Sequence, residues 1–362
     1  MSTAIALGLI PGFGFHKAVS ATCTVRIPAI AIPAPDPASQ SELDPRFALV
    51  TLPDGSRWIV GEEALSVPTA QHIPVLDRNR YHEPRFLAVL QATLHAALPT
   101  DPAAITLCVG MPSVALFDQS ARAALEAAIH TAIAPHHVAQ LTIVSEAAGI
   151  YYADLFEGGQ FHRERRQGLS GVIDIGFRDF TIALFADGKP VLFESRPGGM
   201  VTVMRAVRSR IASSYGLELS EHEVDAALRN KQVRLGRRLV PLPVGTDETI
   251  RDALGMITTT ARSLWPDGGQ RIPRILCGGG GAPLLVPHLI RAFPNAEIHV
   301  PDLPAAPLDL APTTADPEAE ARWSEAVRWA VSEADPQLAG PRGLYWMAEA
   351  QLLRQRTVGE AA

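Results

Sequence analysis

The chain has 362 residues, of which 47% are hydrophobic and 19% charged. This length and apolar content suffice for two domains, or for one large α/β fold with two lobes. The formal net charge of -6 excludes an overall basic field of the kind that attracts nucleic acid. No uninterrupted apolar run approaches the ~18 residues of a membrane-spanning helix.

Three cysteines, Cys23, Cys108 and Cys277, lie far apart in the sequence and within apolar runs. Their spacing fits neither a disulfide framework nor a zinc site, and buried free cysteines are typical of a reducing compartment. The N-terminus has no cationic segment before its apolar stretch and no clear cleavage site, which argues against a signal peptide. We therefore expect a cytoplasmic protein without direct membrane attachment.

The first half of the chain begins with an apolar strand at 4–10 and a glycine-rich turn that contains Gly12, Phe13, Gly14 and Lys17. Glycines let the backbone bend over a ligand, and a lysine places a point charge beside a phosphate. An ordinary glycine-rich hairpin with an exposed lysine explains the stretch equally well. The pattern further predicts strands at 18–32, 47–51, 57–60, 104–109 and 138–144 and helices at 84–98 and 118–133.

The next helix is predicted to begin directly after the strand at 138–144. Ser145 is a suitable N-cap, which places Glu146 at the positive end of the helix and at the carboxyl edge of the sheet. Complementing the helix dipole is an alternative explanation for this glutamate. The polar and basic stretch 158–168 is interpreted as a linker between two lobes.

The stretch 171–185 has the pattern of two strands joined by a tight turn. Its first strand is apolar except for Asp174, and a carboxylate inside such a run requires a partner. Gly176 and Phe177 begin the turn. Exposed N–H groups in such a turn cradle phosphate oxygens, while the carboxylate holds Mg²⁺ directly or through water. An ordinary hairpin whose aspartate caps a turn is the competing interpretation.

Two helices in the second half start with glycines, at 200–215 and at 282–290. The glycines are Gly198, Gly199, Gly278, Gly279, Gly280 and Gly281. A strand at 272–276 precedes the second run, and strand, glycine run and helix is a setting in which a nucleotide lies over the backbone. A flexible linker is the alternative there. The remaining expected elements are strands at 191–194 and 297–300, a short, basic hairpin at 233–240, helices at 220–228, 247–264 and 318–331, and a last helix ending near 354.

Six motifs taken in chain order resemble those of the actin-like ATPase superfamily, most closely the ParM/StbA-type actin-like proteins of bacteria and archaea. They are two phosphate motifs (9–17 and 174–179), an adenosine motif (277–282), a strand end (110–112), a connecting segment (145–149) and a closing segment (335–343). The likeness covers nearly the whole chain. It implies an α/β fold of two ribonuclease H-like lobes with a nucleotide cleft between them.

The resemblance also implies a division of the chain and a set of site residues. Lobe I would span 1–165 with a small subdomain at about 33–100, lobe II would span 166–334 with a helical subdomain at about 200–264, and the C-terminal helix at 335–362 would pack back on lobe I. ATP or GTP with Mg²⁺ would occupy the cleft. Phosphates would contact Gly12, Phe13, Gly14, Lys17, Asp174, Gly176 and Phe177, and the nucleoside would contact Gly278, Gly279, Gly280 and Gly281, with Gly198 and Gly199 near the sugar. Asp174 would be the metal-side carboxylate, and Glu146 would orient or activate the attacking water.

Two positions of the first phosphate motif depart from the family's pattern. The threonine or asparagine that usually precedes the lysine is His16 in this chain, and the second departure bears on metal binding and hydrolysis. The first phosphate motif normally carries an aspartate two residues before its first glycine, and this chain has Ile10 there. The resemblance implies a nucleotide-dependent filament-forming ATPase for plasmid or DNA segregation, whose partners are its own copies and a DNA-bound adaptor protein. Because of Ile10, an actin-like nucleotide-binding scaffold with weak or no hydrolysis is an alternative. A small-molecule kinase of the same superfamily is a third reading, with Asp179 as its candidate catalytic aspartate.

Overall fold

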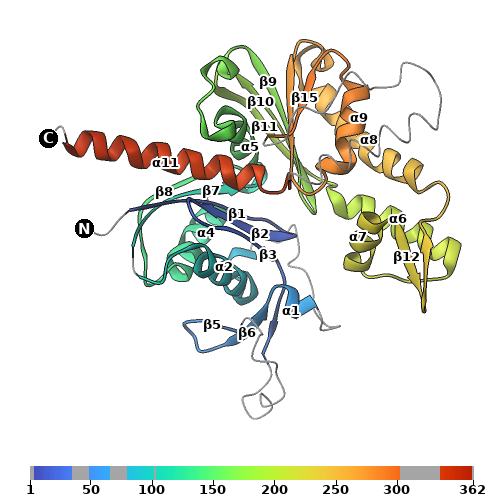
Figure 1. The fold of residues 1–362 in the computed structure, drawn as a ribbon, viewed down its shortest axis with the longest axis horizontal. Helices are drawn as coiled ribbons and strands as arrows, with labels where there is room; N and C mark the ends of the chain where they lie inside the picture. Colours follow the sequence, from blue (N-terminus) through green and yellow to red (C-terminus); the bar gives the residue numbers. More distant parts are fainter. Residues whose placement is uncertain (1–3, 35–48, 66–79, 102, 302–334, 361–362) are drawn as a thin grey trace.

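Two five-stranded sheets with the same topology dominate the molecule (Figure 1). The computed structural model describes residues 4–34, 49–65, 80–101, 103–301 and 335–360. The first sheet has the order β3-β2-β1-β7-β8, and the second has the order β11-β10-β9-β14-β15. In each, three antiparallel strands are extended by two parallel strands.

The strands of the two sheets have the following bounds. The first sheet consists of β1 (Ile5–Pro11), β2 (Phe15–Ser20), β3 (Thr24–Pro28), β7 (Ala104–Met111) and β8 (His137–Ser145). The second consists of β9 (Leu169–Ile175), β10 (Asp179–Ala186), β11 (Lys189–Pro197), β14 (Arg274–Gly278) and β15 (Glu297–His299).

The side chains of β1 alternate between the two faces of the first sheet, and helices cover both faces. Leu7 and Leu9 face a core formed with α2 (Pro84–Ala97) and α4 (Gln119–Ala132). Ala6 and Ile10 face the opposite side, where they pack against α11 (Ala339–Glu360). Because successive residues of a strand point to opposite faces, one short apolar run supplies two separate cores.

The second sheet repeats this arrangement. Ile173 and Ile175 of β9 pack with α6 (Met200–Tyr215), α8 (Thr246–Leu264) and α9 (Ala282–Ala292). Val172 packs on the other face with α5 (Glu146–Leu155). Each sheet therefore has one helix on the face that is turned toward the centre of the molecule, α11 for the first and α5 for the second.

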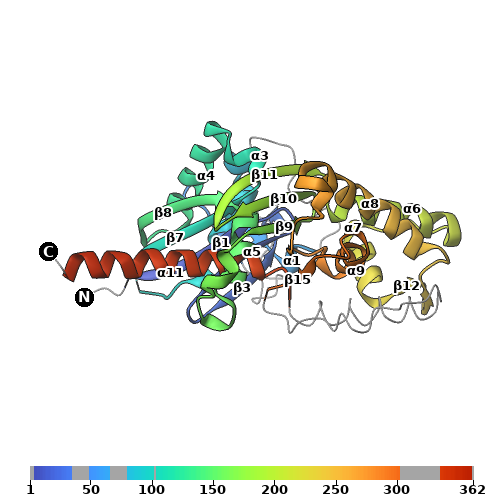
Figure 2. The ribbon, with the colours of Figure 1, turned by 90° about the horizontal axis from the view of Figure 1, so that it is seen from above.

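The two central helices contact each other through glycines. A Cβ atom built on Gly343 of α11 would lie 1.7 Å from the carbonyl oxygen of Gly149 in α5, and one on Gly149 would lie 2.3 Å from that of Gly340. Side chains at these positions would separate the helices, so glycine sets the distance between the two halves. The long α11 runs along the first sheet, over β1 and β7, and contacts α5 (Figures 1 and 2).

Smaller elements extend from the edges of the two halves. Next to the first sheet lies a three-stranded sheet with the order β4-β6-β5, formed by β4 (Ala31–Pro33), β5 (Leu49–Thr51) and β6 (Arg57–Val60). The second half carries α7 (Glu221–Asn230), which begins with a complete capping box, and the hairpin of β12 (Gln232–Leu235) and β13 (Arg238–Pro241). The short helices are α1 (Glu62–Leu65), α3 (Ser113–Leu116), η2 (Arg80–His82), η3 (Glu157–Gly159), η4 (Arg163–Arg166) and η5 (Pro266–Gly269).

Most predicted elements occur within a few residues of their expected bounds, and the exceptions are local. The stretch 158–168, predicted as the linker between two lobes, contains residues of two short 3₁₀ helices. Cys108 and Cys277 are buried, but Cys23 is only half-buried, and all three are free thiols. The helix expected at 318–331 lies outside the described residues. Among the described helices, we find none whose length and hydropathy would let it cross a membrane.

Candidate functional site

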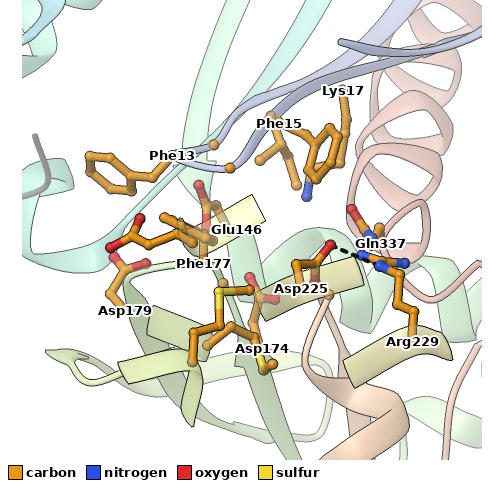
Figure 3. A pocket seen from close by; sticks show the side chains of 18 residues that line it. Phe13, Phe15, Lys17, Glu146, Asp174, Phe177, Asp179, Asp225, Arg229 and Gln337 are labelled. Atoms are coloured by element: carbon orange, nitrogen blue, oxygen red, sulfur yellow. Dashed lines mark hydrogen bonds and ion pairs between the residues drawn. The ribbon is translucent and has the colours of Figure 1, made fainter. Parts of the chain in front are cut away.

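A pocket lies between the two halves, where β1 and β9 end (Figure 3). Of the predicted site residues, its lining contains Gly12, Phe13, Gly14, Lys17, Glu146, Asp174, Gly176, Phe177 and Gly280. It also contains Ile10, Phe15, Asp179, Met200, Met204, Glu221, Asp225, Arg229 and Gln337. Residues from the start, the middle and the end of the chain thus meet in one place.

The first loop of the pocket joins β1 to β2. Ile10 of β1 pairs with Lys17 of β2, so the lysine stands at the base of the loop and extends into the pocket (Figure 3). A Cβ atom on Gly12 would lie 2.9 Å from the carbonyl oxygen of Phe15, which makes a side chain there unfavourable. The loop therefore brings main chain and one cation to the pocket.

The second loop joins β9 to β10 and faces the first. Asp174 lies near the end of β9, and the N–H of Gly176 donates a 2.9 Å hydrogen bond to the carbonyl oxygen of Asp179. A Cβ atom on Gly14 of the first loop would lie 3.0 Å from Cβ of Phe177. The two loops are in contact, so any ligand between them touches both halves.

Burial is the largest cause that raises the pKa values of three carboxyl groups in the pocket. Burial, followed by the charges of Asp174 and Asp179, raises the pKa of Glu146 to about 8. Burial and the charge of Asp174 raise the pKa of Asp179 to about 6, and burial raises the pKa of Asp174. Lys17 opposes each of these shifts. Such a cluster favours a bound proton or cation.

Glu146 is the first residue of α5, as predicted, but Ser145 does not cap that helix with its side chain. The Ser145 hydroxyl lies 3.0 Å from the hydroxyl of Ser113 instead. Glu146 is 8% exposed. The helix N-terminus and the strand end together hold this carboxyl group beside the second loop.

Sequence reasoning missed a buried cation below the first loop. Arg80 is 3% exposed, its guanidinium lies 3.8 Å from the ring centroid of Phe13, and it donates a 3.0 Å hydrogen bond to the carbonyl oxygen of Pro11. Within the described residues, its Nε has no hydrogen-bond partner. Burial, followed by the charge of Arg80, lowers the pKa of the fully buried His16 well below the ordinary value. No local pattern around Arg80 marked it, because its contacts with Phe13 and Pro11 are tertiary.

The glycines of the 278–281 run have different surroundings. Gly280 lines the pocket, where a Cβ atom would meet only the Gln337 side chain, at 3.5 Å. A Cβ atom on Gly279 would lie 2.3 Å from the carbonyl oxygen of Ile175, and one on Gly278 would lie 2.5 Å from Ile150. The pocket-facing position is therefore Gly280, and its neighbours allow β14 and α9 to pack closely on β9 and α5. Gly281 likewise faces Ile175 and Met200.

Gly198 and Gly199 lie behind the second loop and are not among the residues that line the pocket. A Cβ atom on Gly199 would lie 2.5 Å from the carbonyl oxygens of both Gly176 and Asp179. The N–H of Met200 also donates a 3.0 Å hydrogen bond to the Gly176 carbonyl. The start of α6 therefore supports the turn from behind.

One side of the pocket is formed by α6 and α7 and was not predicted. Glu221, Asp225 and Arg229 recur every four residues along α7 and so share one helix face. Arg229 is paired with Asp225 at 2.9 Å (Figure 3). The i, i+4, i+8 spacing of these charges was visible in the sequence, but nothing in it indicated that the face would border a pocket.

A second charged cluster lies where α5 meets the edge of the second sheet. Asp154, Glu157 and His299 place possible ligand atoms within 4.8 Å of one another. Arg274 and Arg165 already bind the Asp154 carboxylate, at 2.7 and 3.1 Å, and Arg165 also binds Glu157 at 2.7 Å. Two guanidinium groups thus cancel the charge of the two carboxylates, and we interpret the cluster as an ion-pair network.

The repeated sheet topology, with a loop pocket between the halves, is the actin-like ATPase fold, which confirms the predicted fold class. Residues 11–146 match the family model described as actin like proteins N terminal domain. No curated protein is significantly similar to the chain in sequence.

Solved structures with this fold include filament proteins. The archaeal actin homolog Ta0583 matches with a TM-score of 0.70 at 17% identity, over 96% of this chain and 99% of its own. A ParM from Clostridium botulinum, solved as a 15-stranded filament, matches with a TM-score of 0.70 at 15% identity, over 97% and 100%. MreB 5 of Spiroplasma citri, solved with AMPPNP, matches with a TM-score of 0.67 at 14% identity, over 99% and 100%. With the family model, these matches confirm the predicted resemblance to ParM-type actin-like proteins.

Proposed function

We propose that this protein is an actin-like ATPase that binds a nucleoside triphosphate between its lobes and forms filaments in response. The observation that carries the proposal is the meeting of two glycine loops across one pocket. Lys17 extends from the first loop, and Asp174 stands at the base of the second. A phosphate chain is the ligand class that uses a lysine, loop N–H groups and carboxylate-bound Mg²⁺ together.

The donor set fits Mg²⁺, because carboxylate oxygens are the protein ligands that this ion prefers. Asp174 would hold it, directly or through water. When bound, Mg²⁺ neutralises charge on the phosphate oxygens. Lys17 contributes a second positive charge from the other half, and Glu146 is positioned to accept a proton from an attacking water. In the ligand-free protein the pKa of Glu146 is raised to about 8, so this carboxyl group carries a proton at neutral pH. A cation bound beside it would lower that pKa and leave the carboxylate free to act as a base.

The nucleoside would lie along α6 and α7. Met200 and Met204 offer an apolar surface for a base, and Gln337 and Gly280 border the same space. ADP bound to Ta0583 and AMPPNP bound to MreB 5 support an adenine nucleotide, with GTP as the alternative.

Filament formation is supported by the ParM and MamK structures with this fold, which are filaments. A head-to-tail contact between identical subunits produces a ring only when the rotation between successive subunits closes. Otherwise the contact repeats without end and produces an open filament. Because a nucleotide would touch both loops, its γ-phosphate can bias the relative position of the lobes and hence this contact. A role in plasmid or DNA segregation through a DNA-bound adaptor rests on the resemblance to ParM.

Ile10 favours a second candidate, a nucleotide-dependent scaffold with slow hydrolysis. The side chain lines the pocket but is 3% exposed, so the first loop offers an apolar group where the family's motif has a carboxylate. The two candidates differ in turnover and share nucleotide binding and assembly.

Sedimentation of the purified protein tests the proposal. The protein is centrifuged with Mg²⁺ and ATP, GTP or a non-hydrolysable analogue, or without nucleotide, and phosphate release is followed in parallel. We expect a pellet only with a triphosphate, and Lys17→Ala should prevent it. Pelleting without measurable phosphate release would favour the scaffold. Absence of nucleotide binding in equilibrium dialysis would refute both candidates.

A further inference from the structure

Arg80 is a buried cation that the proposed function does not use. It is the first residue of η2, which lies shortly before α2 in the chain, and it is only 3% exposed. A guanidinium group keeps its proton in proteins, so this charge is permanent. Burying such a charge is costly unless an anion compensates it. The surroundings of Arg80 should therefore indicate which anion it serves.

The hydrogen bonds and ring contacts of Arg80 hold the first loop from below. Its Nη2 donates a 3.0 Å hydrogen bond to the carbonyl oxygen of Pro11 and another of 3.0 Å to the hydroxyl of Tyr81. Its guanidinium lies 3.8 Å from the ring centroid of Phe13 and 4.5 Å from that of Tyr81. Pro11 and Phe13 flank Gly12, which lines the pocket together with Phe13. Arg80 thus fixes the loop on both sides of Gly12 without lining the pocket itself.

No carboxylate pairs with this guanidinium in the described part of the chain. Its partners there are a carbonyl oxygen, a hydroxyl group and aromatic rings, and its buried Nε has no partner. The nearby His16 is neutral, because burial, followed by the charge of Arg80, lowers its pKa well below the ordinary value. Both ring nitrogens of His16 also lack hydrogen-bond partners among the described residues. The anion that compensates Arg80 therefore lies across the loop, on the pocket side.

The charge of Arg80 reaches the pocket at the end where Glu146 stands. Burial raises the pKa values of Glu146 and Asp179, and Arg80 opposes both rises. Burial also raises the pKa of Asp174, and there the opposing cation is Lys17. In the proposed function, Glu146 faces the attacking water. The terminal phosphate of a bound triphosphate would therefore be the phosphate closest to Arg80.

We propose that Arg80 is a positioning residue for the terminal phosphate of a bound triphosphate. It holds Pro11 and Phe13, and hence the N–H groups of the first loop, in place, and its fixed charge attracts the terminal phosphate through the loop. This inference rests on the proposed function, because it adds a residue to the same site. Lys17 would contact the phosphates directly, whereas Arg80 acts from behind the loop and favours a triphosphate over a diphosphate. A charge that is already in position requires no rearrangement when the ligand binds.

The test compares the full-length wild type with Arg80→Met, Arg80→Gln and Arg80→Lys. The first two variants remove the charge, and glutamine keeps an N–H donor, so it serves as the neutral variant if the methionine variant does not fold. Lysine keeps the charge. Arg85→Met is the control of equal charge change, because Arg85 lies in α2, outside the pocket, and pairs with Glu83. Calorimetry with Mg²⁺ measures the affinities for a non-hydrolysable ATP analogue, ADP and inorganic triphosphate.

We expect both neutral variants to bind the ATP analogue and inorganic triphosphate about tenfold more weakly than the wild type, with a clearly smaller loss for ADP. Arg80→Lys should recover most of the preference for the analogue over ADP. Arg85→Met should bind all three ligands as the wild type does. A merely structural role would lower the three affinities equally and would not be rescued by lysine, and that result overturns the inference.

Three further outcomes separate this inference from the proposed function. Wild-type affinities in both neutral variants overturn the role of Arg80 and leave the proposed function intact. Binding of inorganic triphosphate that depends on Arg80, in a protein that binds neither nucleotide, supports the role of Arg80 and overturns the proposed function. A wild type that binds none of the three ligands overturns both.

Discussion

Replacing Ile10 by aspartate would give the first loop the carboxylate that the related motif carries. The structure argues that this change cannot simply restore a missing function. A Cβ atom on Gly340 would lie 2.6 Å from Cδ1 of Ile10, and one on Gly110 would lie 2.8 Å from its Cγ1. Ile10 therefore packs on the backbones of α11 and β7, and it belongs to a buried cluster with Leu344.

The cost of the substitution has two parts. Truncating a buried isoleucine costs about 2–5 kcal/mol, and a carboxylate placed beside Asp174 and Glu146 adds an unfavourable charge. We expect Ile10→Asp to lower the free energy of unfolding by about 4 kcal/mol or more, and Ile10→Val, the matched control, by about 1 kcal/mol. Phosphate release should not rise, because the added charge repels phosphate.

Equilibrium unfolding in urea, monitored by circular dichroism, measures both changes against the wild type. If Ile10→Asp unfolds at the same urea concentration as Ile10→Val, then position 10 is not a packing position and the reasoning fails. A clear gain in phosphate release by Ile10→Asp would also refute this reasoning. It would indicate instead that a carboxylate at position 10 promotes hydrolysis.

Three further predictions concern pH, a buried ion pair and helix contact. Between pH 4.5 and about 8 the native protein should hold a proton on Glu146 that the unfolded chain lacks. The free energy of unfolding therefore falls as the pH rises through this interval. The melting temperature of the ligand-free wild type should drop more over the same interval than that of Glu146→Gln. Arg274→Met should lower the free energy of unfolding by about 3–5 kcal/mol, because the buried Asp154 loses its partner at 2.7 Å. The control Arg122→Met removes an exposed ion pair and should change the free energy of unfolding by less than about 1 kcal/mol. Equal urea midpoints for the two variants would contradict this prediction. The methyl group of Gly343→Ala would lie 1.7 Å from the α5 backbone. This variant should lower the free energy of unfolding by about 3 kcal/mol in the same assay. The control Gly255→Ala in α8 places its methyl group in open space and should leave the free energy of unfolding unchanged or raise it.

The sequence predicted the order of elements well because both sheets are built from short apolar strands bounded by glycine and proline. β1 and β9 stand out as β-branched or leucine-rich runs, and the residues that interrupt or end them, Asp174 and Gly12, line the pocket. The α7 capping box was likewise visible as Ser220 followed by Glu223. Such signals are local, and local chemistry determined these elements.

What the sequence could not show depends on contacts between distant segments. Arg80 meets the first loop across nearly seventy residues, and no spacing rule connects them. The glycine run at 278–281 was predicted as a nucleoside surface, but three of its members face β9 or α5, and Gly280 lines the pocket. A glycine needed for close packing has the same sequence signature as one needed for a ligand. Only the tertiary structure distinguishes the two.

The distribution of charge across the pocket bears on how a ligand could control assembly. Lobe I presents Lys17, whereas lobe II presents Asp174 and Asp179, and Glu146 stands between them at the start of α5. A cation alone would satisfy lobe II and repel Lys17, and a phosphate chain alone would satisfy Lys17 and repel the carboxylates. A phosphate chain with its cation satisfies both sides at once, so it has the largest differential affinity for the closed arrangement. A ligand shifts a conformational equilibrium only by such a difference. We therefore expect nucleotide in EDTA to bind to the protein without causing it to sediment, whereas nucleotide with Mg²⁺ should cause sedimentation. Pelleting of equal extent in the two conditions would show that closure does not depend on this charge arrangement.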